Sequence, residues 1–106
     1  MRTLTTLLTI LFISLLSSPS WSETVSWDDL VERNELYYKK FSNTPFSGEV
    51  TGKVSGKFNK GNKEGEWLSY FDNGQLKSLG NYKDGLKDGL FEYYYKNGQL
   101  WDKLNY

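Results

Sequence analysis

The side chains of this chain that could do chemistry are carboxylates and aromatic rings, because histidine and cysteine are both absent. The chain therefore has no imidazole or thiolate metal ligand, no Cys or Ser–His nucleophilic pair and no imidazole general base. A glycoside hydrolase needs only two carboxylates, and the candidates are Glu64, Asp88, Glu92 and Asp102. Nothing in their spacing places two of them in one cleft. We therefore expect no enzymatic activity, no cofactor and no metal site.

Aromatic residues make up 17% of the chain, with eight Tyr, six Phe and four Trp. Tyr and Trp suit binding surfaces because they combine a large apolar area with a hydrogen-bonding tip. A short single-layer sheet cannot cover both of its faces, and contiguous exposed aromatic side chains mark interaction sites. The residues that we expect to form such a surface are Tyr70, Tyr93, Tyr94 and Trp101.

The charge balance excludes one class of partner and disfavours another. Lys plus Arg and Asp plus Glu both number 13, so no net charge would attract nucleic acid. Lipid binding through anionic headgroups is likewise not favoured, because there is no basic excess. The lysines between residues 53 and 63 are followed directly by Glu64 and Glu66, a pattern that is typical of a solvated loop.

The first 22 residues have the pattern of a secretory signal peptide. Arg2 supplies a positive charge, residues 4–16 are almost continuously apolar, and Ser20 and Ser22 flank a bulky residue. The apolar run is shorter than the roughly 20 residues that a membrane-spanning helix needs. We expect cleavage before Glu23 and a periplasmic or secreted protein, in which packing alone stabilises the fold because no disulfide can form.

Residues 56–79 recur as residues 80–103 with a constant offset of 24, and a truncated third copy follows. A fixed period of about 20 to 50 residues is the signature of a repeat architecture. In the third copy Leu104 stands where the first two have Gly56 and Gly80. The positions that define the repeat are Gly65, Trp67, Asn73 and Gly74 in the first copy and Gly89, Phe91, Asn97 and Gly98 in the second.

Each repeat is predicted to form two strands and two turns, so that the array is an all-β antiparallel meander. Asn73-Gly74 and Asn97-Gly98 favour type I′ hairpin turns, in which both central residues take positive φ. Alternation along the strands predicts that the odd-numbered positions share one face. The expected core residues are Trp67, Phe71, Phe91 and Tyr95.

Residues 23–55 are expected to cap the repeats, because two repeats are fewer than the three or more that a solenoid generally needs. Ser26 is a candidate N-cap for a short helical turn, with Asp29 three residues later. Residues 30–33 and 36–39 predict a hairpin around Asn34-Glu35. The only proline after the signal segment, Pro45, excludes a central strand there, and a strand is expected at 46–51.

The combination Gly-x-Trp, Tyr-x-x-Asn-Gly and Tyr-Lys-x-Gly-x-x-x-Gly resembles the variant MORN repeat of bacterial proteins, a family that includes antitoxin-repeat-like proteins. The similarity covers residues 56–106, with Phe91 replacing Trp in the second repeat. It implies β-hairpin arrays that contact proteins or lipids, so the partner that we expect is an unidentified protein or envelope component. We also consider a cell-wall glycan-binding module, a membrane-lipid-associated MORN protein and an antitoxin-like inhibitor.

Overall fold

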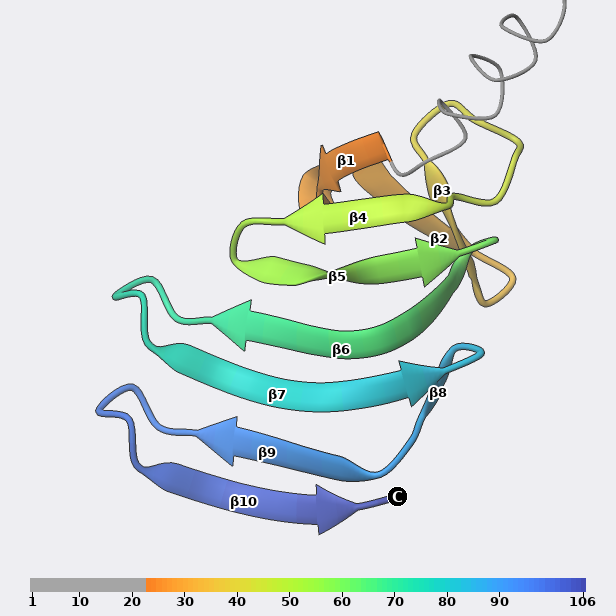
Figure 1. Cartoon of the computed structure of the whole chain (residues 1–106). Helices are drawn as coiled ribbons and strands as arrows, with labels where there is room; N and C mark the ends of the chain where they lie inside the picture. Colours follow the sequence, from red (N-terminus) through yellow and green to blue (C-terminus); the bar gives the residue numbers. More distant parts are fainter. Residues whose placement is uncertain (1–22) are drawn as a thin grey trace, which may run out of the picture.

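A curved sheet of sequentially ordered strands organises the chain, and Figure 1 shows it as a staircase that ends at β10. The computed structural model describes residues 23–106, so the predicted signal peptide lies outside the described residues. The strands of this sheet are β1 (Glu23–Ser26), β4 (Gly48–Thr51), β5 (Val54–Asn59), β6 (Asn62–Tyr70), β7 (Leu76–Lys83), β8 (Leu86–Lys87), β9 (Leu90–Tyr94) and β10 (Leu100–Asn105). The strand order β4-β5-β6-β7-β9-β10, antiparallel throughout, confirms the predicted meander.

The segment before the repeats folds onto the first strands of the sheet (Figure 1). The predicted hairpin is confirmed as β2 (Leu30–Arg33) and β3 (Leu36–Lys39), with positive φ at both Asn34 and Glu35. A 3₁₀ turn, η2 (Trp27–Asp29), follows Ser26, whose backbone N–H donates to the Asp29 carboxylate at 3.0 Å. Sequence reasoning missed β1, which pairs in parallel with β4 and forms one edge of the sheet.

Two faces of the sheet follow from the register of the repeats. Trp67 lies opposite Gly80 and Ser69 opposite Ser78 on adjacent strands, and Ser78 in turn lies opposite Tyr93. Directly paired residues point to the same side of a sheet, so these residues share one face, which we call the core face. The intervening positions, among them Leu68 and Leu79, form the outer face.

The core lies where the N-terminal segment covers the core face. Its buried side chains are Leu30, Phe46, Val50, Phe58 and Trp67. Trp27 and Tyr37 pack against them from above the sheet, with the Tyr37 and Phe58 ring centroids 4.9 Å apart. From there an aromatic ladder crosses the strands of the repeats, with neighbouring centroids 4.9 to 6.3 Å apart, through Phe58, Trp67, Tyr82, Phe91 and Tyr106.

The core prediction is half right. Trp67 and Phe91 are buried, with 5% and 4% of their surfaces exposed. Phe71 is only partly buried, and the prediction for Tyr95 is wrong because 51% of this residue is exposed. Both lie just beyond the strand ends, where the N-terminal segment no longer covers the core face. Sequence reasoning also missed Phe58 as a core residue, although it occupies the repeat position of Tyr82.

The two Asn-Gly corners are present, but they are not the two-residue type I′ turns that we predicted. Asn73 keeps a negative φ, and only Gly74 takes a positive value, +86°. The Gly74 N–H donates to the Phe71 carbonyl at 2.9 Å, and the Phe71 N–H donates to Gln75 at 2.8 Å. This is a three-residue loop with a left-handed glycine at its end, and the second corner repeats it around Gly98.

The asparagine side chain explains the longer loop. Asn73 Oδ1 accepts the Gln75 N–H at 3.0 Å, and Asn97 does the same with Gln99. Asn thus stabilises the turn through its side chain rather than through positive φ. The type I′ geometry occurs instead at the opposite edge of the sheet, where Asp84 and Gly85 have φ values of 52° and 82°.

Two glycines carry the close packing of the aromatic ladder. A Cβ at Gly56 would lie 2.2 Å from the Trp67 ring, and a Cβ at Gly80 would lie 2.1 Å from the Phe91 ring. We therefore expect Gly80→Ala to reduce the free energy of unfolding by about 1 to 3 kcal/mol through overpacking. Urea denaturation followed by tryptophan fluorescence measures this change.

Leu104→Ala supplies the matched control for this prediction. Leu104 occupies the same repeat position as Gly80, is 42% exposed and lies on the last strand of the sheet. Because this side chain is partly solvated, we expect its truncation to cost about 1 kcal/mol or less. A Gly80→Ala variant as stable as Leu104→Ala would contradict the close-packing argument.

Candidate functional site

An aromatic groove lies at the edge of the sheet where both Asn-Gly corners turn. It encloses about 450 Å³, and its walls come from the ends of β6, β7, β9 and β10 and the loops beside them. The residues that line it are Phe71, Lys77, Ser78, Tyr93, Tyr94, Tyr95, Lys96 and Trp101. Asn73 joins its two corners, because Asn73 Nδ2 donates to the Lys96 carbonyl at 3.1 Å.

A β-bulge places Trp101 in the groove. Tyr94 pairs with Leu100 and Tyr93 pairs with Asp102, so Trp101 is the extra residue on β10. A bulge re-aims a side chain relative to regular alternation. The Trp101 ring accordingly lies 6.1 Å from the Tyr93 ring and 6.3 Å from the Tyr95 ring, centroid to centroid. It is 61% exposed, so an apolar surface of two rings and an indole remains open to solvent.

The same bulge occurs in the first repeat, where it carries a different residue. Lys77, which is 24 positions before Trp101, is the extra residue between the pairs Ser69–Ser78 and Tyr70–Leu76. Its ammonium nitrogen lies 5.8 Å from the centroid of the Phe71 ring. The groove therefore lies between two equivalent bulges, one with a lysine and one with a tryptophan.

The structure divides the four predicted surface residues between the two faces. Tyr93 and Trp101 contact each other in the groove. Tyr70 follows Ser69 and so belongs to the outer face. Although Tyr94 also borders the groove, its hydroxyl donates to the Glu92 carboxylate, and this hydrogen bond raises the pKa of Tyr94. The sequence prediction missed Tyr95, which was assigned to the core.

The charge of the groove comes from lysines. Lys77 and Lys96 line it, and no carboxylate is among its lining residues. The nearby acid Asp72 already pairs with Lys53 at 2.5 Å, and this hydrogen bond lowers the pKa of Asp72. Within residues 23–106, neither groove lysine forms an ion pair.

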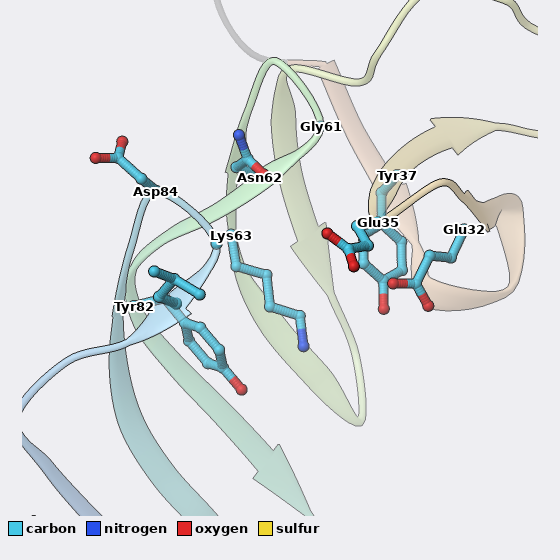
Figure 2. Close-up of a pocket in the computed structure, with 10 residues that line it drawn as sticks. Glu32, Glu35, Tyr37, Gly61, Asn62, Lys63, Tyr82 and Asp84 are labelled. Atoms are coloured by element: carbon cyan, nitrogen blue, oxygen red, sulfur yellow. The ribbon is translucent and has the colours of Figure 1, made fainter. Parts of the chain in front are cut away.

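A second hollow, the hairpin cleft, lies between the β2–β3 hairpin and the turns that begin β6 and end β7 (Figure 2). It encloses about 370 Å³. Its lining residues are Glu32, Glu35, Tyr37, Gly61, Asn62, Lys63, Tyr82, Asp84, Gly85 and Leu86. Figure 2 shows the Lys63 side chain extending between Tyr82 on one side and Tyr37 with the two glutamates on the other.

Lys63 fills an aromatic cage rather than an ion pair. Its ammonium nitrogen lies 4.9 to 5.9 Å from four ring centroids, those of Trp27, Tyr37, Trp67 and Tyr82. Such cation–π contacts favour the charged form, but burial opposes it and lowers the pKa of Lys63, an effect that Glu32 offsets in part. Among the described residues, no hydrogen bond or ion pair of this ammonium is present.

The repeat shows that this lysine is part of the architecture. Lys87, 24 positions later, places its ammonium nitrogen 5.1 Å from the Phe91 ring and 5.0 Å from the Tyr106 ring. Sequence reasoning treated residues around Lys63 as a solvated loop, and the recurrence of lysine at 63 and 87 was the signal that could have revealed these contacts. The hairpin cleft thus belongs to the packing of the core, and the aromatic groove is the better candidate for binding.

Two further classes of site have no support in residues 23–106. This part of the chain contains no cluster of three or more Asp or Glu residues that could hold a metal ion. It also contains no helix long and apolar enough to cross a membrane. The carboxylates that a hydrolase would need, Glu64 among them, serve structure where their contacts are seen: the Glu64 carboxylate accepts the Asp84 N–H at 2.7 Å.

An open β-meander with a glycine-packed aromatic ladder and an exposed aromatic groove defines a repeat protein that acts as a binding scaffold. The family model of the MORN repeat variant matches residues 63–84 and 87–106, so these two segments are MORN variant repeats. The two matches begin 24 residues apart, at Lys63 and Lys87. No curated protein matches the chain. No solved structure matches it either.

The buried position of Lys63 predicts a pH dependence of stability. In the unfolded chain this lysine has its ordinary pKa of 10.5, and in the folded protein its pKa is lower. Between the two values the unfolded chain holds more protons, so the contribution of Lys63 to the free energy of unfolding rises with pH through this window. We expect the wild-type value minus that of Lys63→Met to increase from about pH 8 to pH 10.5, measured by urea denaturation.

The tyrosines of the cage do not disturb this comparison. Burial raises the pKa of Tyr37 and Tyr82, which destabilises the folded protein above pH 10, the ordinary pKa of tyrosine. Both tyrosines are present in wild type and variant, so their contribution largely cancels in the difference. A difference that stays level or decreases over this pH range would refute the cage assignment.

Proposed function

We propose that this protein is an exported, non-enzymatic scaffold that binds another protein of the cell envelope through the aromatic groove. The observation that carries the proposal is the cluster of exposed rings at the corner edge, with Tyr95 51% and Trp101 61% exposed. Single surface aromatics are ordinary, but these two contact each other and enclose a cavity with Phe71 and Tyr93.

The shape of the groove favours a protein partner over a sugar. Glycan-binding platforms present flat rings together with polar groups for the sugar hydroxyls. Here the Tyr93 and Trp101 planes meet at 74° and the Tyr95 and Trp101 planes at 52°, so the rings form walls rather than a flat surface. An apolar side chain inserted between such walls is the usual anchor of a protein interface, and its loss typically costs 2 kcal/mol or more, as a rough guide.

The rigidity of the surroundings supports a preformed site. The groove residues belong to strands that are paired on both sides, except for β10 at the edge, and the corners are joined by the bond from Asn73 to Lys96. A preformed groove loses less conformational entropy on binding than a mobile loop does. MORN repeats without a catalytic centre can therefore serve as a binding surface.

Site-specific photo-crosslinking tests this function. A photo-crosslinking amino acid placed at Tyr95, inside the groove, should give discrete covalent adducts with a partner when the full chain is expressed in a bacterial host. The same amino acid placed at Tyr70, on the outer face, is the matched control and should give none. Mass spectrometry of the adducts identifies the partner.

Additional variants connect the adduct to the groove. We expect Trp101→Ala to reduce the Tyr95 adduct at least about tenfold while changing the free energy of unfolding by about 1 kcal/mol or less, because the indole is mostly exposed. Equal adducts from Tyr95 and Tyr70, or adducts that persist in Trp101→Ala, would exclude the groove as the binding site.

Export is tested separately by the mass of the mature protein. The sequence predicts cleavage between Ser22 and Glu23, so the exported chain should begin at Glu23. Intact-mass measurement of the protein from the periplasmic or secreted fraction gives this end directly. A full-length chain that is confined to the cytoplasmic fraction would contradict export.

A further inference from the structure

We propose that the aromatic groove binds an acidic peptide segment, in which an apolar or aromatic side chain is flanked by carboxylates. This inference rests on the proposed function and adds the chemistry of the partner. It depends on two observations about the groove: the shape of its aromatic walls and the charge of the lysines that border it.

The walls suit one inserted side chain. Trp101 stands between Tyr93 and Tyr95, with centroid distances of 6.1 and 6.3 Å, and Phe71 closes the groove on the side of the first repeat. The volume of about 450 Å³ accommodates an aromatic side chain together with part of its backbone. Such an anchor would cover the exposed faces of Tyr95 and Trp101 and would remove on the order of 150 to 250 Å² of its own surface from water.

The lysines determine the sign of the flanking charge. Lys77 and Lys96 border the groove, and none of its lining residues is acidic. Other lysines of the described chain have acidic partners, as in Lys39–Glu23 at 2.6 Å and Lys53–Asp72 at 2.5 Å. In residues 23–106, Lys77 and Lys96 have no ion pair, so their charges are available to a ligand.

Position strengthens the pairing of charge with the anchor. Lys77 is the bulge residue equivalent to Trp101, so its ammonium lies over the Phe71 ring at the mouth of the same groove. Lys96 follows Tyr95 directly at the second corner. A carboxylate one or two residues from the inserted side chain would therefore lie beside an ammonium, an arrangement that raises both affinity and rate of association.

Selection from a library of random linear peptides tests the proposal. The immobilised full chain is the bait, and peptides that also bind Trp101→Ala are removed. We expect the remaining peptides to contain an aromatic or apolar residue with Asp or Glu beside it. Their dissociation constants are then measured by fluorescence anisotropy at low and at high salt.

Charge variants separate the inference from the function on which it rests. The double variant Lys77→Gln with Lys96→Gln should weaken binding of a selected peptide at least about tenfold. The control Lys40→Gln with Lys83→Gln removes two exposed lysines that do not line the groove, and should change binding by less than about twofold. High salt should weaken binding to the wild type more than to the Lys77/Lys96 variant.

Three results would overturn the proposal. Peptides that depend on Trp101 but are neutral or basic, or that bind the Lys77/Lys96 variant normally, would refute the acidic partner and leave the groove as a protein-binding site. Retention of the protein on insoluble peptidoglycan that is lost in Trp101→Ala would assign the groove to a glycan. If no peptide depends on Trp101, the inference fails, and the proposed function fails with it only if the Tyr95 crosslink is also absent.

Discussion

The contact of an aromatic ring with a glycine on the neighbouring strand is the interaction on which this structure depends. Trp67 covers Gly56 and Phe91 covers Gly80, and in both places a single methyl group would occupy the position of the ring. Each buried ring contributes several kcal/mol as an upper bound, from about 150 to 250 Å² at about 25 cal/mol per Å². A single-layer sheet has no second layer to bury its side chains, so rings lying flat across their own strands provide the missing cover.

The lysines of the repeat complete this arrangement. Lys63 and Lys87 extend over the same rings and shield them from solvent with their aliphatic stems, while each ammonium stays close to the aromatic faces. This explains why Phe91 is 4% exposed although the N-terminal segment covers only the first strands. It also explains why a large cleft beside Lys63 is better understood as packing than as a binding site.

Sequence reasoning predicted what a period can reveal and missed what depends on the third dimension. The offset of 24 residues predicted the meander, the corners and the buried positions of Trp67 and Phe91, because equivalent residues repeat equivalent contacts. It did not predict that Asn73 would use its side chain to build a three-residue loop. The parallel pairing of β1 with β4 was also beyond reach, since it joins segments whose pairing no local pattern indicates.

The candidate site was predicted in part for the same reason. Tyr93 and Trp101 were expected at the surface and meet there, but alternation alone could not show that a bulge turns Trp101 toward Tyr93 and Tyr95. The groove arises where the two repeats differ, with Lys77 at one bulge and Trp101 at the other. Equivalent positions thus maintain the fold, and departures from equivalence produce the surface that distinguishes this protein.

Leu104 brings the stacking of rings to a stop. It lies opposite Phe91 on the core face of β10, at the position where the earlier repeats have glycine. A further hairpin, from another molecule of the same kind, would need to rest its ring on this spot and would meet a branched side chain instead. The free edge of the sheet is therefore a poor template for its own kind, which disfavours runaway end-to-end growth of molecules into fibres.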